Sequence, residues 1–193
     1  MTRYLLLIIS AVLVNNFVLT RYLGICPFLG VSREISTALG MGLAVIFVIT
    51  CASMVTWFVY TSVLVPLHIQ YMQTIAFILV IATFVQFVEY VLKKKVPALH
   101  RAMGIYLPLI TTNCCVLAVA VLNVQMTHNL LQSAAFGFGA AAGFALALII
   151  FSGLREKIDR SCPPEAFRGT AIALVTAGLL GLAFMGFAGL VKM

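Results

Sequence analysis

Six long apolar stretches take up almost the whole of this chain. A helix that crosses the hydrocarbon core needs about 20 mainly apolar residues, and lipid offers no hydrogen-bond partner to an open backbone. The stretches lack the alternation of polar and apolar residues that is typical of a membrane barrel. The chain is therefore predicted to be an all-α integral membrane protein. Its six helices are expected near residues 4–23, 40–60, 74–92, 103–122, 131–151 and 170–191.

The composition supports a single membrane domain. Only 9% of the residues are charged, whereas a soluble domain carries about 25%, and the mean hydropathy is +1.15. The net charge of +7 does not indicate nucleic-acid binding, because the cations lie in short loops between spans. The apolar run after Arg3 lacks a small-residue cleavage site, so it is interpreted as a retained first span rather than a secretory signal.

The Lys and Arg residues are distributed unevenly among the predicted loops. All of them except Arg3 and Lys192 fall in the first, third and fifth loops, and the second and fourth loops hold none. Since cytoplasmic loops carry the excess of Lys and Arg, these odd-numbered loops are predicted to be cytoplasmic and both termini to face outward. The loop cations are Arg21, Arg33, Lys93, Lys94, Lys95, Arg101, Arg155, Lys157, Arg160 and Arg168.

Two of the six spans are interrupted by polar residues. In the first, residues 4–14 give only about 16 Å of helix before Asn15 and Asn16, and Cys26-Pro27 follows. In the fourth, residues 107–117 contain Pro108, then Thr111, Thr112 and Asn113, and then two cysteines. Lipid-exposed polar groups are costly at this depth, so these residues are expected to face protein, water or a cofactor.

The interrupted spans open two halves of three spans each, residues 1–96 and 97–193. A three-span unit repeated in tandem enters the membrane in opposite orientations, so the halves are predicted to form an inverted repeat. Paired broken helices in such repeats indicate a functional site near the midplane. The alternative is that the Asn and Thr side chains only hydrogen-bond neighbouring helices.

Few titratable residues lie within the spans. Glu89, near the cytoplasmic end of the third span, is a candidate proton or sodium site, or else an interfacial carboxylate paired with a nearby lysine. His68, His100 and His128 fall in loops without metal-ligand spacing, so a zinc site is poorly supported. No nucleophile triad or phosphate-binding loop occurs.

The cysteines offer another chemistry. Their number, five, is odd and most lie in or beside spans, which argues against a secreted disulfide framework. Thiolates are the usual ligands of iron–sulfur clusters, and a [2Fe–2S] cluster normally needs four. Cys26 and Cys114 could supply two if a second, similar chain supplied the others. Alternatively, both are ordinary structural cysteines.

At these residues the chain resembles a known family. Residues 15–19 (NNFVL), 23–32 (LGICPFLGVS) and 107–114 (LPLITTNC) are similar to the membrane subunits of Rnf/Rsx ion-translocating electron-transport complexes. That family includes RnfA, RnfE, NqrD and NqrE, and the doubled Asn and the CPF sequence resemble the RnfA members most. Residues 167–169, 176–179 and 184–187 also match, so the resemblance covers essentially the whole chain.

The resemblance implies a multi-pass subunit of a bacterial inner-membrane complex, with both termini in the periplasm. Such a complex exchanges electrons between NADH and ferredoxin and couples this to Na⁺ or H⁺ transport. The membrane subunit that this chain resembles is not catalytic on its own. It pairs with an RnfE-like homologous subunit of opposite topology, and the two share one intramembrane [2Fe–2S] cluster. The other Rnf subunits (B, C, D and G) carry NADH, FMN and the remaining clusters.

Carried over to this chain, the resemblance makes Cys26 and Cys114 the cluster ligands. Asn15, Asn16, Glu89, Thr111, Thr112 and Asn113 become candidates for the ion pathway or for hydrogen bonds around the cluster. This chain departs from the family in having Cys115, where a small apolar residue is common. Adjacent helical residues point about 100° apart, so only one of the two cysteines is expected to face the cluster. The resemblance implies that this one is Cys114, with Cys115 a packing residue or a substitute ligand if Cys114 is lost.

Two other functions fit the broken helices. An inverted-repeat secondary transporter with a midplane solute site would have the same paired interruptions. A structural scaffold for redox partners would need neither cysteine. The cysteines and their motifs favour the electron relay.

Overall fold

The computed structural model describes residues 12, 16–32, 34–95, 107–161 and 169–186. All regular elements in these ranges are helices, and none of the described residues forms a strand. The predicted all-α class is therefore confirmed for the part of the chain that the structure describes.

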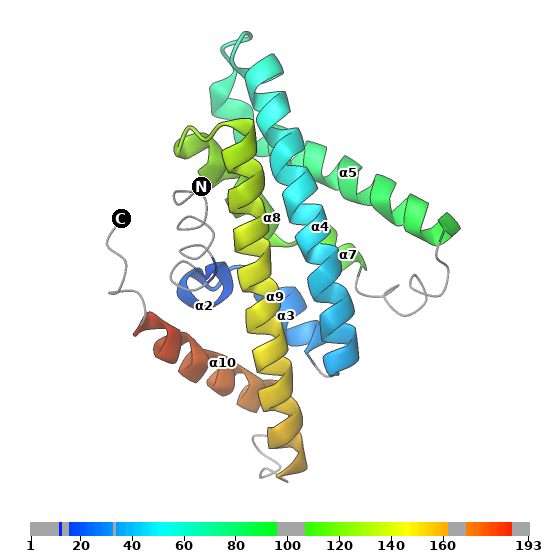
Figure 1. The fold of residues 1–193 in the computed structure, drawn as a ribbon, viewed down its shortest axis with the longest axis vertical. Helices are drawn as coiled ribbons and strands as arrows, with labels where there is room; N and C mark the ends of the chain where they lie inside the picture. The colour runs from blue at the N-terminus through cyan, green and yellow to red at the C-terminus, as the bar shows by residue number, and fades with distance from the viewer. Residues whose placement is uncertain (1–11, 13–15, 33, 96–106, 162–168, 187–193) are drawn as a thin grey trace.

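Two long antiparallel helices form the centre of the molecule (Figure 1). They are α4 (Ile35–Val59) and α9 (Leu130–Arg160). Small residues allow them to approach closely: a Cβ built at Gly42 would lie 3.1 Å from the Cβ of Ala145, and one built at Gly137 would lie 2.6 Å from the Oγ of Ser53. Close approach through small residues is the usual way in which helices pack in membranes.

Two further helices leave the central pair on opposite sides (Figure 1). They are α5 (Gln73–Lys95) and α10 (Thr170–Met185). Both expose large apolar side chains, such as Leu79 on α5 and Leu182 on α10. Such surfaces are stable against lipid or against another membrane subunit, and not against water.

Four segments are long and apolar enough to cross a membrane: Ile35–Leu64, Gln70–Val91, Pro108–Gln125 and Leu130–Arg160. They correspond to the predicted second to fifth spans. The second span ends in a π-helical turn, η2 (Tyr60–Leu64), and a 3₁₀ turn, η3 (Gln70–Met72), precedes α5.

The first and last predicted spans are only partly covered by the structure. Most of the first, including Asn15, lies outside the described residues. The last begins at Thr170 as predicted, but α10 has 16 described residues, fewer than a full span. Residues 187–191, which the prediction included, lie outside the described ranges.

Both segments that were predicted to be interrupted contain short helices, but in the first the described break follows Arg21 and does not lie at Asn16. One chain segment forms α2 and α3, separated by Tyr22, Leu23 and Gly24. The other forms α7 and α8, separated by Thr112 and Asn113, so that Pro108 lies inside α7 and not at the break. The bounds are α2 (Phe17–Arg21), α3 (Ile25–Val31), α7 (Leu107–Thr111) and α8 (Cys114–Gln125).

Asn16 and Asn113 begin their helices in the same way. Each is the N-cap residue, with φ and ψ of −65° and 110° at Asn16 and −70° and 110° at Asn113. The Asn16 Oδ1 accepts a hydrogen bond from the Val18 amide at 3.1 Å, and the Asn113 Oδ1 accepts one from the Cys115 amide at 3.0 Å. A side-chain oxygen thus satisfies a backbone donor that the helix start would leave unpaired.

Candidate functional site

The starts of α3 and α8 meet at a contact between Gly24 and Cys114. The Gly24 amide donates a hydrogen bond to the Cys114 Sγ at 2.8 Å. Gly24 has φ of +81°, a conformation that favours glycine. A Cβ at this position would also lie 2.9 Å from both the Asn113 Oδ1 and the Phe144 Cε2. Only glycine therefore fits this position without strain.

Cys26 and Cys114 both lie in the first turn of their helices. Cys26 is the second residue of α3 and Cys114 the first residue of α8. Both thiols belong to exposed residues, whereas Cys115 is fully buried in the core. The expected division between the adjacent cysteines is thus present: Cys114 faces outward and Cys115 packs inside. The start of the 12-residue helix α8 also stabilises negative charge at Cys114.

Asn113 carries a free donor beside this contact. Its side chain is 4% exposed, and the Nδ2 has no hydrogen-bond partner among the described residues. An unpaired buried amide is costly, so a missing acceptor is expected nearby. Thr112 is exposed and donates its hydroxyl to the Pro108 carbonyl at 3.0 Å, and Thr111 is half-buried.

Asn16 lies on the other broken segment and is fully satisfied. It is completely buried, and its Nδ2 donates to the Gly143 carbonyl of α9 at 2.8 Å. This hydrogen bond joins α2 to the central helix pair. Asn15, which was predicted to share its role, lies outside the described residues.

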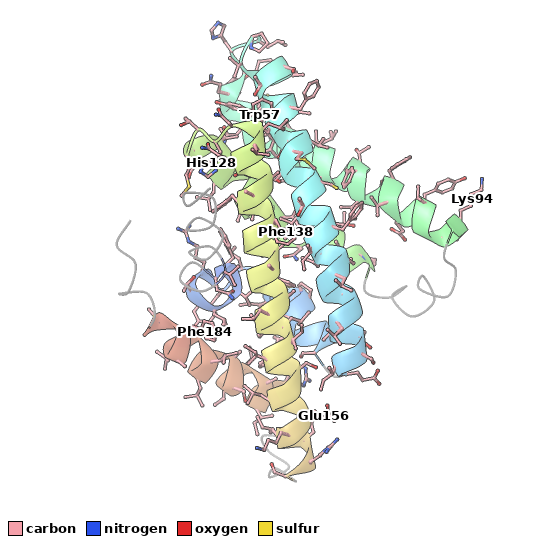
Figure 2. The ribbon with its side chains drawn as sticks, viewed as in Figure 1. Trp57, Lys94, His128, Phe138, Glu156 and Phe184 are labelled. Carbon is pink, nitrogen blue, oxygen red and sulfur yellow. The ribbon has the colours of Figure 1, made fainter. Side chains whose placement is uncertain are left out.

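Glu89 stands apart from the two cysteines in the described contacts. It is half-buried on α5, and the ion pair within the described residues is formed elsewhere, between Arg160 and Glu156. The exposed Lys94 lies five residues beyond it, near the end of α5 (Figure 2). The structure therefore leaves both interpretations of Glu89 open, the ion site and the interfacial carboxylate.

The described residues hold half of a metal site at most. No three His, Cys, Asp or Glu side chains among them are grouped closely enough to bind a metal ion. Cys51 is half-buried in α4, and Cys162 and His100 lie outside the described residues. Two exposed thiols, one of them receiving an amide hydrogen bond, together with an unpaired amide donor, fit one side of a thiolate-ligated cluster.

Gly24 and Arg155 are buried residues whose roles the sequence interpretation missed. Gly24 could have been found, because it stands two residues before a Cys-Pro pair. Arg155 was assigned to a loop, which is wrong, because it lies within a helix; the cytoplasmic side of this region stays a prediction. Helix α9 continues to Arg160, and the Arg155 side chain is only 6% exposed. A signal was present, since Arg155 lies four residues after the buried Phe151 and therefore on the same helix face.

A second group of polar residues lies at the end of α4 and α9 that is opposite to Arg155. Figure 2 shows Trp57 and His128 close together at one end and Glu156 at the other. The Trp57 Nε1 donates to the His128 carbonyl at 2.8 Å, and the His128 Nδ1 lies 3.0 Å from the Asn123 Oδ1. His128 is in the turn between α8 and α9, and burial lowers its pKa.

Known proteins of one family are similar to this chain over almost its whole length. Residues 4–191 match the family described as "Rnf-Nqr subunit, membrane protein". A protein of Syntrophotalea carbinolica, named as the A component of an ion-translocating oxidoreductase complex, is 62% identical over 192 residues, covering 99% of each chain. Proteins of the same name from Yersinia enterocolitica and Escherichia coli K12 are each 58% identical, covering 100% of each chain.

Proposed function

Because this chain belongs to the Rnf-Nqr family of membrane subunits, we propose that it is an electron-relay subunit of an ion-translocating oxidoreductase complex. In this function Cys26 and Cys114 are thiolate ligands of an intramembrane [2Fe–2S] cluster. The full-length similarity to subunits named for such a complex favours the relay over a secondary transporter.

The contact between Gly24 and Cys114 carries the proposal. It joins the segment that contains Cys26 to the start of α8, although the two are 90 positions apart in the chain. Both cysteines are exposed there, as ligands shared with another chain must be. Lone structural cysteines are more often buried.

The residues around the cysteines support thiolate ligation. The Gly24 amide stabilises negative charge on the Cys114 sulfur. The unpaired Asn113 Nδ2 supplies a further donor for a sulfur acceptor. When bound, a [2Fe–2S] cluster accepts and releases single electrons, at a potential set partly by such hydrogen bonds. The Gly24 amide thus holds the Cys114 sulfur, and both donors would favour the reduced, more negative state.

A homologous chain completes the site. Two thiolates remain to be supplied, and an RnfE-like subunit of opposite topology would supply them from the facing surface. The other Rnf subunits (B, C, D and G) would deliver and remove electrons. This chain contributes no group for substrate chemistry, so it acts only within the assembled complex.

The inverted repeat is part of the proposal. The antiparallel packing of α4 against α9 and the matching caps at Asn16 and Asn113 both fit halves at residues 1–96 and 97–193. The outward-facing termini would then be periplasmic, and the subunit would lie in the bacterial inner membrane. These features are expected of a chain whose broken helices meet near the membrane midplane.

Ion coupling would act through charge. A negative charge added beside Cys26 and Cys114, in a medium of low dielectric constant, favours a nearby cation. Asn15, Asn16 and Glu89 are the candidate groups of the Na⁺ or H⁺ pathway. Replacing Asn16 or Glu89 is expected to reduce ion uptake into vesicles that contain the complex more than it reduces electron transfer. Unchanged uptake in both variants would remove these residues from the pathway.

The relay itself is tested by spectroscopy on the purified complex. We expect an EPR signal of a reduced [2Fe–2S] cluster that is lost in Cys26→Ser and kept in Cys51→Ser, the matched control in α4. If the cluster signal persists in Cys26→Ser, this chain does not hold the cluster as proposed. Solute uptake by the chain alone would instead support the transporter.

A further inference from the structure

Arg155 is a buried charge that forms no ion pair with any residue the structure describes. Its side chain is 6% exposed, and within the described residues no carboxylate pairs with it. The next residue, Glu156, pairs with Arg160 instead. A buried, uncompensated cation is costly, because the protein interior replaces little of its hydration. We therefore expect the arginine at this position to have a role that an apolar residue could not perform.

The guanidinium binds the end of the helix that carries Cys26. The Arg155 Nη1 donates to the Leu29 carbonyl at 2.8 Å and to the Ser32 Oγ at 2.9 Å. Leu29 is in the last turn of α3, where backbone carbonyls lack helical partners and the helix dipole favours positive charge. Arg155 is thus the C-terminal cap of α3, supplied by α9.

A second contact holds the same two helices together one turn earlier. The rings of Phe28 and Phe151 stack with their centroids 4.3 Å apart and their planes 22° apart. Phe151 precedes Arg155 by four residues on α9, so the two side chains share one helix face. Helix α3 is therefore fixed to α9 by an aromatic stack and by a charged cap.

Arg155 is also close to the proposed ligand. Cys26 lies three residues before Leu29, a rise of about 4.5 Å along the helix. The guanidinium is hydrogen-bonded to the Leu29 carbonyl, which puts it roughly 10 Å from the Cys26 backbone. At that separation and an effective dielectric constant of about 20, a unit charge changes an equilibrium by about tenfold.

We propose that Arg155 positions Cys26 through α3 and that its fixed positive charge raises the midpoint potential of the redox group bound there. The inference rests on the proposed function, because it requires a cluster at Cys26. A cation near a site that becomes more negative on reduction stabilises the reduced state. The expected effect is about a tenfold change in the reduced-to-oxidised ratio at a fixed potential, which corresponds to about 59 mV for a one-electron couple.

The test is an EPR-monitored redox titration of the assembled complex. Arg155→Gln removes the charge, and Arg155→Lys keeps it while changing the hydrogen-bond geometry. Lys157→Gln is the matched control, because it removes an exposed cation from the same helix. We expect a lowered midpoint in Arg155→Gln only.

A second pair of variants tests the charge without removing Arg155. Ser32→Asp places a carboxylate against the guanidinium, and Ser32→Asn has nearly the same size without the charge. We expect Ser32→Asp to lower the midpoint relative to Ser32→Asn. If the complex that contains Arg155→Gln does not assemble, the comparison of Ser32→Asp with Ser32→Asn tests the proposal.

The outcomes separate the two proposals. A cluster signal with the same midpoint in Arg155→Gln and the wild type, or in Ser32→Asp and Ser32→Asn, overturns the role of Arg155 and leaves the cluster proposal standing. A wild-type complex without a cluster signal overturns the proposed function itself.

Discussion

The amide of Gly24 donates to the sulfur of Cys114 across 2.8 Å. This single contact joins two helix starts that are far apart in the sequence. It requires a residue that tolerates φ of +81° and leaves no room for a side chain. The ligand geometry therefore depends on a residue that has no side chain of its own.

Gly24→Ala is expected to destabilise the protein by roughly 1–3 kcal/mol, the usual cost of a non-glycine residue held in a left-handed conformation. The new Cβ would also press on Asn113 and Phe144. Thermal unfolding of the purified complex measures this effect. Gly40→Ala in α4 is the control, because a Cβ there meets nothing within 4 Å. Equal stability of the two variants would contradict the crowding at Gly24.

Asn16→Ala is expected to cost about 2 kcal/mol. The change removes an N-cap, which is worth about 1 kcal/mol, and a buried hydrogen bond to Gly143, which is worth about as much. Asn16→Ser keeps a capping oxygen and loses only the bond to α9, so it should fall between Ala and the wild type in thermal unfolding. A serine variant as unstable as the alanine variant would show that the cap contributes little.

Acid should weaken the turn between α8 and α9. Burial lowers the pKa of His128 below its usual value of about 6.5. The unfolded chain then binds a proton more readily than the folded one. This contribution to stability is present above pH 6.5 and is lost as the pH falls toward the lowered pKa. Unfolding temperatures measured from pH 7.5 to pH 5 should fall less in His128→Gln than in the wild type. Identical pH profiles would rule out His128 as the cause.

The orientation of the chain is tested by fusion at its C-terminus. Since the predicted odd-numbered loops and the helix ends beside them carry all the Lys and Arg residues except Arg3 and Lys192, a reporter that is active only after export should be active there. A reporter that folds only in the cytoplasm should be inactive at the same position. Activity of the cytoplasmic reporter would reverse the proposed topology.

Much of the architecture follows from hydropathy and polar interruptions. The helical class, the middle four spans and the break between Thr111 and Cys114 were all predictable, because lipid allows few alternatives for the backbone. Helical geometry predicted that Cys114 and Cys115 point in different directions, and the family resemblance indicated that Cys114 is the outward-facing one. These features depend on local sequence.

The remaining features depend on contacts between distant segments. The meeting of Gly24 with Cys114 joins α3 to α8, and the cap at Leu29 comes from Arg155 on α9. Charge counting placed Arg155 in a loop, because an Arg beside polar residues resembles a helix end. Only the packing of α3 against α9 makes it a buried residue.

Cys114, and not its neighbour, is proposed to bind the cluster together with Cys26. The most direct test compares the EPR spectra of the reduced, purified complex from the wild type, Cys114→Ser and Cys115→Ser. We predict that the [2Fe–2S] signal disappears in Cys114→Ser and persists in Cys115→Ser. A signal that persists in Cys114→Ser would contradict this assignment.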